Sequence, residues 1–518
     1  MPVVLGVLLW LGCSATDDPS RASVPVAPTE ALTVTVPEPS GAPVDPTGPN
    51  LELLCADRCG DVWLDGLALA CDDCRTGDAL AEAMAPVDHA LAQYAERSAM
   101  DDMVGVDAVA VRSHAEQALR RIPDADRATV AALNRVVQGY RNGHSGLLSL
   151  DGCDAVGGVD PWWSPHGGCL EPLDDHYVVT EASAALSLLP GDRVHAVNGR
   201  SGTTLVDHLA DGPLCATGAS TDDVRHELAA HVLLGSLQPG DHLEVERLDG
   251  TFVSVEVATP TESDGQWCGP DTRDWIDSYV RDDGVAVIRV SRWILAPGDP
   301  NYVSIYDVED YDDYLEAMLS HAQEHFDAVT PGATGLVWDI RANGGGFTYT
   351  TLALAAGMPG AREGVVTRCV GRVPGSDPVA YTRWPLVYEL VPDDRFAFDG
   401  PVAALFDGRS VSASDYFAYT LRSFTDVRLF GRPTAGAFGG SSAAEPLPGT
   451  DGLYLGVDGV RCDDADGVPL ETRSVQPHEW VEPDPHDVAA GIDTVLERAA
   501  SWVVLAAQPS PKPEREAR

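Results

Sequence analysis

The sequence predicts a multidomain α/β protein, in which a helical region and a strand-rich region precede a large domain of alternating strands and helices. With 518 residues, the chain is too long for one hydrophobic core. Its hydrophobic periodicity also changes along the chain, from helical to strand-like and then to an alternation of both. We therefore expect a helical domain over residues 51–146, a β-rich domain over 170–262 and an α/β domain over 275–505.

The expected helical domain contains three segments with apolar residues at helical spacing, Gly77–Met84, Ser113–Arg120 and Ala125–Val137. Four cysteines precede them, namely Cys55, Cys59, Cys71 and Cys74. Their spacing alone would suit a zinc site, but no histidine lies inside the cluster. We therefore expect disulfide bonds that staple this domain, although the pairing cannot be derived from the sequence.

The expected β-rich domain carries a turn motif of some specificity. Leu188–Gly199 contains Pro-Gly-Asp followed by Asn-Gly, and a second Pro-Gly-Asp occurs in Leu237–Gly250. These segments resemble the core and the closing strands of a PDZ domain, a small barrel that binds an extended peptide end along a sheet edge. The long interval between them predicts an insertion near Asp211–Ser220. A generic β-barrel without peptide binding is the alternative.

The expected α/β domain alternates strand and helix patterns. Gly284–Val290 and Gly335–Ile340 have the continuous apolar character of buried strands, and Tyr311–Phe326 between them has the period of an amphipathic helix. Gly491–Val504 is expected to be a terminal helix. This order is typical of an α/β domain with its own core.

The charge balance is strongly acidic. The chain has 80 Asp and Glu against 34 Lys and Arg, which gives a net charge of −46, and its single lysine is Lys512. A field of this sign repels nucleic acids and anionic membrane surfaces, so we expect no nucleic-acid partner. A surface suited to a salty environment, or codon bias toward arginine, explains the composition more simply than a specific cationic substrate does.

The N-terminus predicts export. Val3–Leu11 is an apolar run that is too short to span a bilayer. Gly12 and Cys13 follow it, and the arrangement resembles a bacterial lipoprotein signal in which Cys13 is the lipidated first residue. The rival interpretation is plain secretion with cleavage after Ala15. We expect a location at the cell envelope or cell surface, with membrane contact only through the lipid anchor.

Residues 1–13 are thus expected to be the signal, 14–50 a tether rich in Pro, Ser and Thr, and 506–518 a charged tail. Export also changes the chemistry expected of the cysteines. Besides Cys13 there are ten cysteines, and an even number in an oxidising compartment indicates disulfides.

A serine-containing turn is the most informative chemical motif. Pro401–Phe406 has the pattern of a buried strand, Tyr416–Ser423 that of a helix, and between them lies the sequence Ser-Val-Ser-Ala-Ser-Asp over 410–415. A strand, turn and helix in this order place Ser412 at a helix start, where backbone N–H groups can receive an oxyanion. A nucleophilic serine needs a base, and Lys512 lies beyond the last expected helix.

A second motif follows another buried strand. Asp339–Gly346 has the sequence Asp-Ile-Arg-Ala-Asn-Gly-Gly-Gly. Successive glycines permit close backbone approach and positive φ angles, so that consecutive N–H groups can point into one concavity.

The glycine motif and the serine motif together resemble the paired signatures of the C-terminal processing and tricorn-type serine peptidases. The expected domain order is also that of this family, and the resemblance covers residues from roughly 70 to 505. It implies a ClpP/crotonase-like α/β catalytic domain with Ser412 as nucleophile. It also implies an oxyanion hole made by backbone N–H groups of Gly345 or Gly346 and of Ala413. The best-known branch uses a lysine where this chain has Ala437.

Another branch of the family uses a histidine near the end of the N-terminal domain. Arg141–Gly146 resembles its Gly-His-Thr/Ser motif, which implies that His144 is the general base, since an imidazole suits that role near neutral pH. Ser145 would either line the site or act only as a cap or turn residue. Glu471, in Glu471–His478, matches the glutamate that orients the base, although Ser474 and His478 depart from the pattern. A surface glutamate is the alternative.

The resemblance therefore implies an exported serine endopeptidase that hydrolyses peptide bonds through a Ser-His-Glu arrangement and needs no metal or organic cofactor. Polypeptides are the expected substrates, and the PDZ-like domain would recognise their ends. The alternative is a catalytically inactive ligand-binding or peptide-binding protein on the same fold. The sequence does not determine the oligomeric state.

Overall fold

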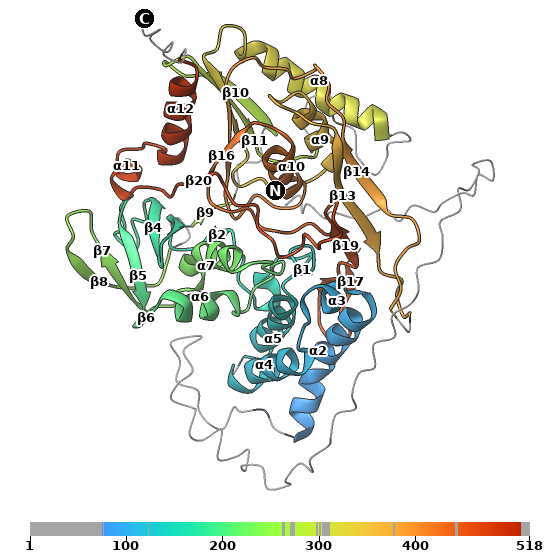
Figure 1. Cartoon of the computed structure of the whole chain (residues 1–518). Coiled ribbons are helices and arrows are strands. Elements are labelled where there is room, and N and C mark those ends of the chain that lie inside the picture. Colours follow the sequence, from blue (N-terminus) through green and yellow to red (C-terminus); the bar gives the residue numbers. More distant parts are fainter. Residues whose placement is uncertain are drawn as a thin grey trace, which may run out of the picture.

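The computed structural model describes residues 75–508, apart from positions 76, 123, 262–264, 270–274, 297–298, 300–301, 303–310, 377–378 and 441–443. The expected signal and lipidation site at Cys13, the tether and the four-cysteine cluster lie outside the described residues, as does nearly all of the tail. Figure 1 shows how the described parts are arranged. None of the helices in this part of the chain has the length and hydropathy needed to cross a membrane.

The first described elements are the helices α2 (Gly77–Arg97), α3 (Met100–Val104), α4 (Ala108–Arg121) and α5 (Ala125–Tyr140). The three segments predicted to be helical lie in α2, α4 and α5, so these predictions are confirmed. Asp107 and Asp124 cap α4 and α5 through side-chain oxygens that accept backbone N–H groups of the first turn.

The helical part is joined to the C-terminal part by a shared sheet and core. The strand β1 (Gly146–Ser149) pairs antiparallel with β18 (Leu453–Gly456), which also pairs with β17 (Glu445–Pro446). Leu447, Leu453, Leu455 and Val457 belong to the same buried cluster as the inner faces of α2, α4 and α5. The loop between α5 and β1, which carries the predicted base, is therefore held at this junction.

The β-rich part is an antiparallel sheet with two helices inserted into it. Its elements are β3 (Cys169–Leu173), β4 (His176–Glu181), β5 (Arg193–Val197), β6 (Arg200–Ser201), α6 (Gly202–Ala210), α7 (Asp222–Ser236), β7 (His242–Glu246) and β8 (Phe252–Glu256). The strand order is β3-β4-β5-β7-β8, with β6 on β5. The insertion predicted near Asp211–Ser220 is the link between α6 and α7, so the inserted segment is longer than expected. A short ladder of β2 (Trp163–Ser164) with β9 (Gln266–Trp267) lies beside it.

The C-terminal part is built on a six-stranded sheet. Its strands are β10 (Ile276–Val280), β11 (Val285–Val290), β12 (Gly335–Asp339), β15 (Val402–Phe406), β16 (Arg428–Gly431) and β20 (Glu479–Trp480), in the order β10-β11-β12-β15-β16-β20. Only the β10–β11 pair is antiparallel. The predicted strands at 284–290 and 335–340 are confirmed as β11 and β12, which are buried as parallel strands usually are.

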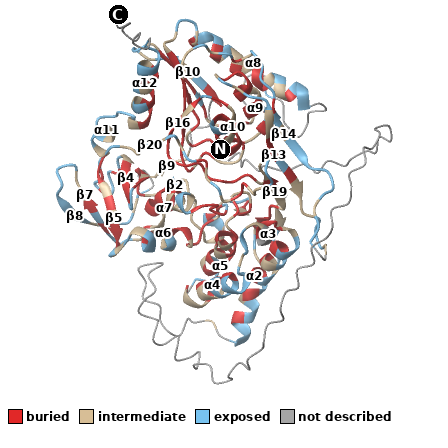
Figure 2. Cartoon of the chain, viewed as in Figure 1, coloured by how far each residue is buried: buried red, intermediate tan, exposed pale blue. Residues whose placement is uncertain are grey.

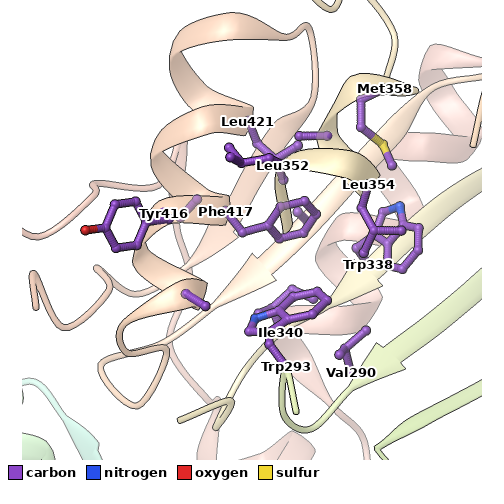
Figure 3. Close-up of a cluster of buried hydrophobic side chains, with 14 of the residues drawn as sticks. Val290, Trp293, Trp338, Ile340, Leu352, Leu354, Met358, Tyr416, Phe417 and Leu421 are labelled. Atoms are coloured by element: carbon purple, nitrogen blue, oxygen red, sulfur yellow. The ribbon is translucent and has the colours of Figure 1, made fainter. Parts of the chain in front are cut away.

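Helices cover both faces of this sheet. The helix α12 (Thr494–Ala506) packs on one face against alternate strand residues such as Val285 and Val287. The helices α8 (Tyr311–Val329), α9 (Thr348–Ala356) and α10 (Ala413–Phe424) pack on the other, where the intervening residues point. Figure 3 shows this second core, in which Trp293, Trp338 and Phe417 pack together, and Figure 2 shows that burial concentrates at the sheet. The result is a three-layer α/β domain within a multidomain α/β protein.

A smaller antiparallel sheet lies beside the main one (Figure 1). It has the order β14-β13-β19, formed by β14 (Leu386–Leu390), β13 (Gly364–Gly371) and β19 (Val460–Asp463). The short helix α11 (Pro485–Ala489) and the 3-10 turn η2 (Asp154–Val156) complete the described elements. Disulfides join Cys153 to Cys215, Cys169 to Cys268 and Cys369 to Cys462, which confirms the disulfide prediction for these six cysteines.

The inserted helix α7 is anchored to the C-terminal domain by a buried ion pair. Arg432 Nη2 lies 2.5 Å from Glu227 Oε1, and Arg432 also donates to the Pro172 carbonyl at 2.8 Å. Gly408, in the turn before Ser412, lies so close that a Cβ atom there would be 2.5 Å from Glu227 Cγ. Burial raises the pKa of Glu227 to about 7, and the Arg432 charge opposes that rise.

Loss of one partner of this pair should loosen the contact between α7 and the C-terminal domain. We expect Arg432→Ala to destabilise the protein by about 3 kcal/mol, because it leaves a buried carboxyl group without its cation. A lower midpoint of thermal unfolding would report this change. Arg362→Ala, which breaks the exposed pair with Asp426, is the control and should cost about 0.5 kcal/mol or less. Equal melting of the two variants would contradict the anchoring role.

Candidate active site

Ser412 occupies a strained position between a buried strand and a helix. It follows β15 and is the N-cap residue of α10, with φ 60° and ψ −119°. The predicted strand, turn and helix are therefore confirmed. A non-glycine residue with positive φ costs about 1–3 kcal/mol and persists only where its surroundings enforce it. Ser412 is half-buried, and its neighbours Ala413 and Ser414 are buried.

Asp415 enforces this conformation. One of its oxygens, Oδ2, accepts the N–H of Ser412 at 2.9 Å and that of Ala437 at 3.1 Å, while Oδ1 accepts the N–H of Gly436 at 2.7 Å. The side chain is fully buried, and burial raises its pKa to about 7. One carboxyl group thus ties the serine turn to the loop that contains Ala437. Sequence reasoning missed this role, although an acid three residues after an N-cap serine is a recognisable capping pattern.

The glycine turn lies directly against the serine turn. A Cβ atom on Gly345 would be 2.6 Å from Ser412 Cβ, and one on Gly346 would be 2.3 Å from the carbonyl oxygen of Trp293. Both residues have positive φ, at 99° and 141°. Only glycine fits these positions, because any side chain would collide with the serine turn or with Trp293.

Asn343 fixes the two turns to each other. Its carbonyl oxygen accepts the N–H of Val411 and the hydroxyl of Ser414, each at 3.0 Å, and its amide nitrogen donates to the Val290 carbonyl at 2.9 Å. Asn343 Oδ1 also accepts the N–H of Gly345 at 2.9 Å. The predicted oxyanion donor Gly345 is therefore already engaged.

Two of the three predicted oxyanion donors stay free. Among the residues that the structure describes, the N–H groups of Gly346 and Ala413 have no acceptor. The backbone nitrogen of Ala413 lies next to Gly345, since a Cβ atom on Gly345 would be 3.2 Å from that nitrogen. Gly346 and Ala413 thus have backbone N–H groups that are available to an acceptor, whereas Gly345 is a close-packing residue.

The loop with His144 reaches this place from the helical part of the chain. Its Asn142 Oδ1 accepts the N–H groups of His144 at 2.8 Å and of Ser145 at 2.9 Å. Gly143 lies on Ala437, because a Cβ on Gly143 would be 2.6 Å from Ala437 Cβ. The loop therefore occupies the space next to the position where the resemblance places a lysine.

The two ring nitrogens of His144 are buried and make no hydrogen bonds within the described residues. Neither ring nitrogen has a hydrogen-bond partner among the described residues, so the ring makes no hydrogen bond to Ser412 or to Glu471 in this structure. Burial lowers the pKa of His144 to about 4, which keeps the imidazole neutral at neutral pH. A neutral imidazole is the form that can accept a proton.

Ser145 does not line the site as expected. It is fully buried, and its hydroxyl oxygen accepts the N–H of Asp458 at 2.9 Å. Asn142 Nδ2 donates to Asp458 Oδ2 at 3.3 Å. Ser145 is therefore a link between the base-bearing loop and the C-terminal domain, and neither a simple turn residue nor an exposed site residue.

Glu471 lies at the junction of three parts of the chain. Its Oε2 accepts the N–H groups of Phe438 at 2.6 Å and Gly439 at 3.0 Å. Its Oε1 accepts the Ser220 hydroxyl at 3.2 Å and the N–H of Gly143 at 3.4 Å. With only 3% of its surface exposed, it is not a surface glutamate. It contacts the backbone of the His144 loop and not the imidazole ring.

Three buried acidic residues, Asp415, Asp458 and Glu471, lie around this junction. Burial raises the pKa of Glu471 to about 7 and that of Asp458 to about 8, and the Glu471 charge adds to the shift of Asp458. Asp458 and Ser220 carried no sequence signal, because they meet Asn142 and Glu471 across 316 and 251 residues. Within the described ranges, no group of three or more His, Cys, Asp or Glu is arranged to hold a metal ion.

These acids should make the folded protein less stable as pH rises from about 7.5 to 8.5. Their folded pKa values of about 7 and 8 lie above those of unfolded carboxyl groups, so the folded state holds more protons in this window. The free energy of unfolding should fall by up to about 1.4 kcal/mol per pH unit for each proton concerned. Near pH 6.5 the buried histidines, whose pKa values are lowered, oppose this fall because their unfolded forms still bind protons, and above about pH 7.5 they contribute little.

The measurement is the thermal midpoint as a function of pH for the parent, for Glu471→Gln and for Glu445→Gln. We expect a smaller slope for Glu471→Gln, since it removes one titrating group from the junction, and an unchanged slope for Glu445→Gln, whose side chain is 45% exposed and lies outside the junction. A stability that rises with pH across this window would contradict the assignment.

Comparison with known proteins relates this geometry to a family. Residues 299–481 match the model described as Peptidase family S41. The structure of mature CPAF complexed with lactacystin aligns with a TM-score of 0.59 and 15% sequence identity, over 83% of this chain and 98% of that chain. Mature CPAF alone gives 0.58 and 15%, over 83% and 97%. At this identity the likeness shows a shared fold. No curated protein matches the chain by sequence.

Proposed function

We propose, on the premise that this chain belongs to the C-terminal processing peptidases of family S41, that it is a serine endopeptidase acting on polypeptides through Ser412, His144 and Glu471. One observation carries the proposal. The base-bearing Gly143–His144 loop packs on Ala437, and Asp415 ties Ala437 to the Ser412 backbone. The candidate nucleophile and the candidate base, 268 residues apart by their numbers, are therefore held at one junction.

The proposed reaction is acyl transfer. The Ser412 hydroxyl oxygen attacks the peptide carbonyl carbon while His144 takes the hydroxyl proton. The oxyanion that forms is received by the N–H groups of Gly346 and Ala413, which have no acceptor among the described residues. His144 then gives its proton to the leaving amine, and water hydrolyses the ester on Ser412 with His144 again as base.

We assign Glu471 an indirect role. Because its oxygens accept N–H groups of Gly143, Phe438 and Gly439, it holds the His144 loop against the serine turn. Its negative charge, where ionised, also favours the imidazolium that forms during the reaction. Glu471 thus acts through the backbone of Gly143 and the local field.

The remaining expectations extend the proposal. We infer that the three-layer domain is of the ClpP/crotonase type and that the sheet of β3 to β8 is a PDZ-like module that captures polypeptide ends. Export and a lipid anchor at Cys13 fit the three disulfides, since such bonds persist in oxidising compartments.

One observation favours the second candidate, a catalytically inactive peptide-binding protein on the same fold. The His144 ring makes no hydrogen bond to Ser412 among the described residues. Catalytic hydrogen bonds are often loose without substrate, so this gap alone does not exclude catalysis. The two candidates differ in whether Ser412 becomes acylated.

Replacement of the nucleophile tests this difference. We expect Ser412→Ala to abolish casein hydrolysis and labelling by a serine-directed fluorophosphonate, because the variant lacks the hydroxyl of the residue whose Cβ lies against Gly345. Ser423→Ala, an exposed serine in the same helix, is the matched control and should keep both. Labelling of Ser412→Ala at the rate of the parent would remove Ser412 from the mechanism.

Chemical rescue tests the base. We expect His144→Ala to lower kcat by about 10²–10⁴-fold, the usual contribution of a general base. Added imidazole should restore part of this loss, because it can enter the space left by the ring. His486→Ala, at an exposed histidine of α11, should leave kcat unchanged. An inactive His144→Ala that imidazole does not rescue, with an unchanged melting temperature, would argue against His144 as base.

A further inference from the structure

The strand β14 is an edge strand with an unusual apolar surface. In the part of the chain that the structure describes, it pairs with β13 on one side only, so one row of its backbone N–H and C=O groups has no strand partner there. Trp384 precedes the strand and is 76% exposed, and the strand opens with Leu386, which is 39% exposed. Edge strands in natural proteins usually carry charged residues that prevent pairing with another chain, yet Glu389 is the only charged residue of β14.

One face of β14 forms an apolar stripe. Side chains alternate along a strand, so Leu386, Tyr388 and Leu390 share a face. Exposure falls along this face from Leu386, through the half-buried Tyr388, to the fully buried Leu390. The stripe therefore runs from open surface into the body of the domain.

The buried end of the stripe adjoins the candidate active site. The Tyr388 ring contacts Tyr349 of α9 at a centroid distance of 5.3 Å and Tyr416 of α10 at 5.4 Å. Tyr349 is 39% exposed and also contacts Phe347, the residue after Gly346, at 5.4 Å. Tyr416 lies one helical turn after Ser412. These ring contacts thus connect the stripe to the residue after Gly346 and to the helix that begins at Ser412.

Two prolines limit the free edge. Pro385 precedes β14 and Pro392 follows it closely. Proline cannot donate a main-chain hydrogen bond, so only a short segment between them can pair with an added strand. The edge therefore suits a short extended peptide and not an open-ended sheet.

We propose that the free edge of β14, with the stripe of Leu386, Tyr388 and Tyr349, binds an extended segment of the polypeptide substrate that has apolar side chains at alternate positions. Main-chain pairing would supply affinity, and the stripe would select apolar side chains. The inference rests on the proposed peptidase function and adds the class of substrate, an unfolded apolar segment.

A second copy of the chain is a less suitable occupant. Each copy carries a net charge of −46, and two such bodies repel one another when they pair edge to edge. A substrate segment carries no comparable charge. An extended polypeptide can follow the stripe toward α9 and α10, whose Tyr349 and Tyr416 contact Tyr388.

The test compares two aspartates on opposite faces of β14. Leu386→Asp places a charge on the stripe, while Val387→Asp, at 36% exposure on the other face, is the matched control. Each change is made in the full chain, once with Ser412 and once with Ser412→Ala. Binding of fluorescein-labelled casein to the Ser412→Ala forms is measured by fluorescence anisotropy, and casein hydrolysis with the Ser412 forms.

We expect Leu386→Asp to weaken casein binding and raise KM by about tenfold, which corresponds to about 1.4 kcal/mol, with kcat and fluorophosphonate labelling unchanged. Val387→Asp should change each quantity less than about twofold. Equal effects of the two substitutions, or none, would overturn the proposal. So would a Leu386→Asp effect confined to a monomer–dimer equilibrium in sedimentation velocity.

The two hypotheses fail in different ways. If Ser412 is not the nucleophile, the Ser412 forms and the Ser412→Ala forms behave alike in hydrolysis and labelling, but casein binding to the Ser412→Ala forms still reports on the stripe. If only the stripe is wrongly assigned, hydrolysis persists in the parent and Leu386→Asp behaves like Val387→Asp.

Discussion

The arrangement depends on one buried carboxyl group, that of Glu471. Its two oxygens receive donors from the helical part at Gly143, from the inserted segment of the β-rich part at Ser220, and from the C-terminal loop at Phe438 and Gly439. Each donor would otherwise be a buried polar group without a partner, which costs about 1–3 kcal/mol. The three parts of the chain therefore meet their hydrogen-bonding needs at the Glu471 carboxyl group. The loop with His144 is held in position because all three parts are docked there.

The alanine at position 437, where the resemblance places a lysine, is part of the same arrangement because it leaves room for the His144 loop. Gly143 approaches Ala437 so closely that even a methyl group on Gly143 would collide with it, so a long side chain at 437 and the present loop exclude each other sterically. Among the described residues, no Lys or Arg side chain donates to Asp415, Asp458 or Glu471 in place of the lysine that the resemblance expects at 437. Burial consequently raises the pKa of Asp415, Asp458 and Glu471 instead of being offset by a paired charge.

The parts of the site that follow from local patterns could be predicted from sequence. Ser412 at a helix start, the glycine turn, and the helices and strands around them each depend on residues a few positions apart. The engagement of Gly345 by Asn343 could not be predicted, because it depends on a side-chain rotamer. The roles of Ser145, Asp458 and Ser220 could not be predicted either, since each is set by contacts between segments hundreds of residues apart, for which a single sequence gives no signal. Glu471 was found through its motif, but its contact with the loop backbone and not the ring is a property of the tertiary structure.

In a site assembled in this way, the position of the candidate base depends on the docking of the helical part on the C-terminal domain. The candidate nucleophile, its strained backbone and the N–H groups of Gly346 and Ala413 belong to the C-terminal domain, and Asp415, Asn343 and the glycine turn hold them without help from elsewhere. The candidate base belongs to the helical part, and its loop is held by hydrogen bonds to Asp458 and Glu471. A small separation of the two parts would therefore remove the base while leaving the oxyanion donors and Ser412 in place. Because the helical part also shares the β1–β18 pairing and a buried core with the C-terminal part, such a separation costs more than the loss of these hydrogen bonds, each of which is worth only about 1 kcal/mol.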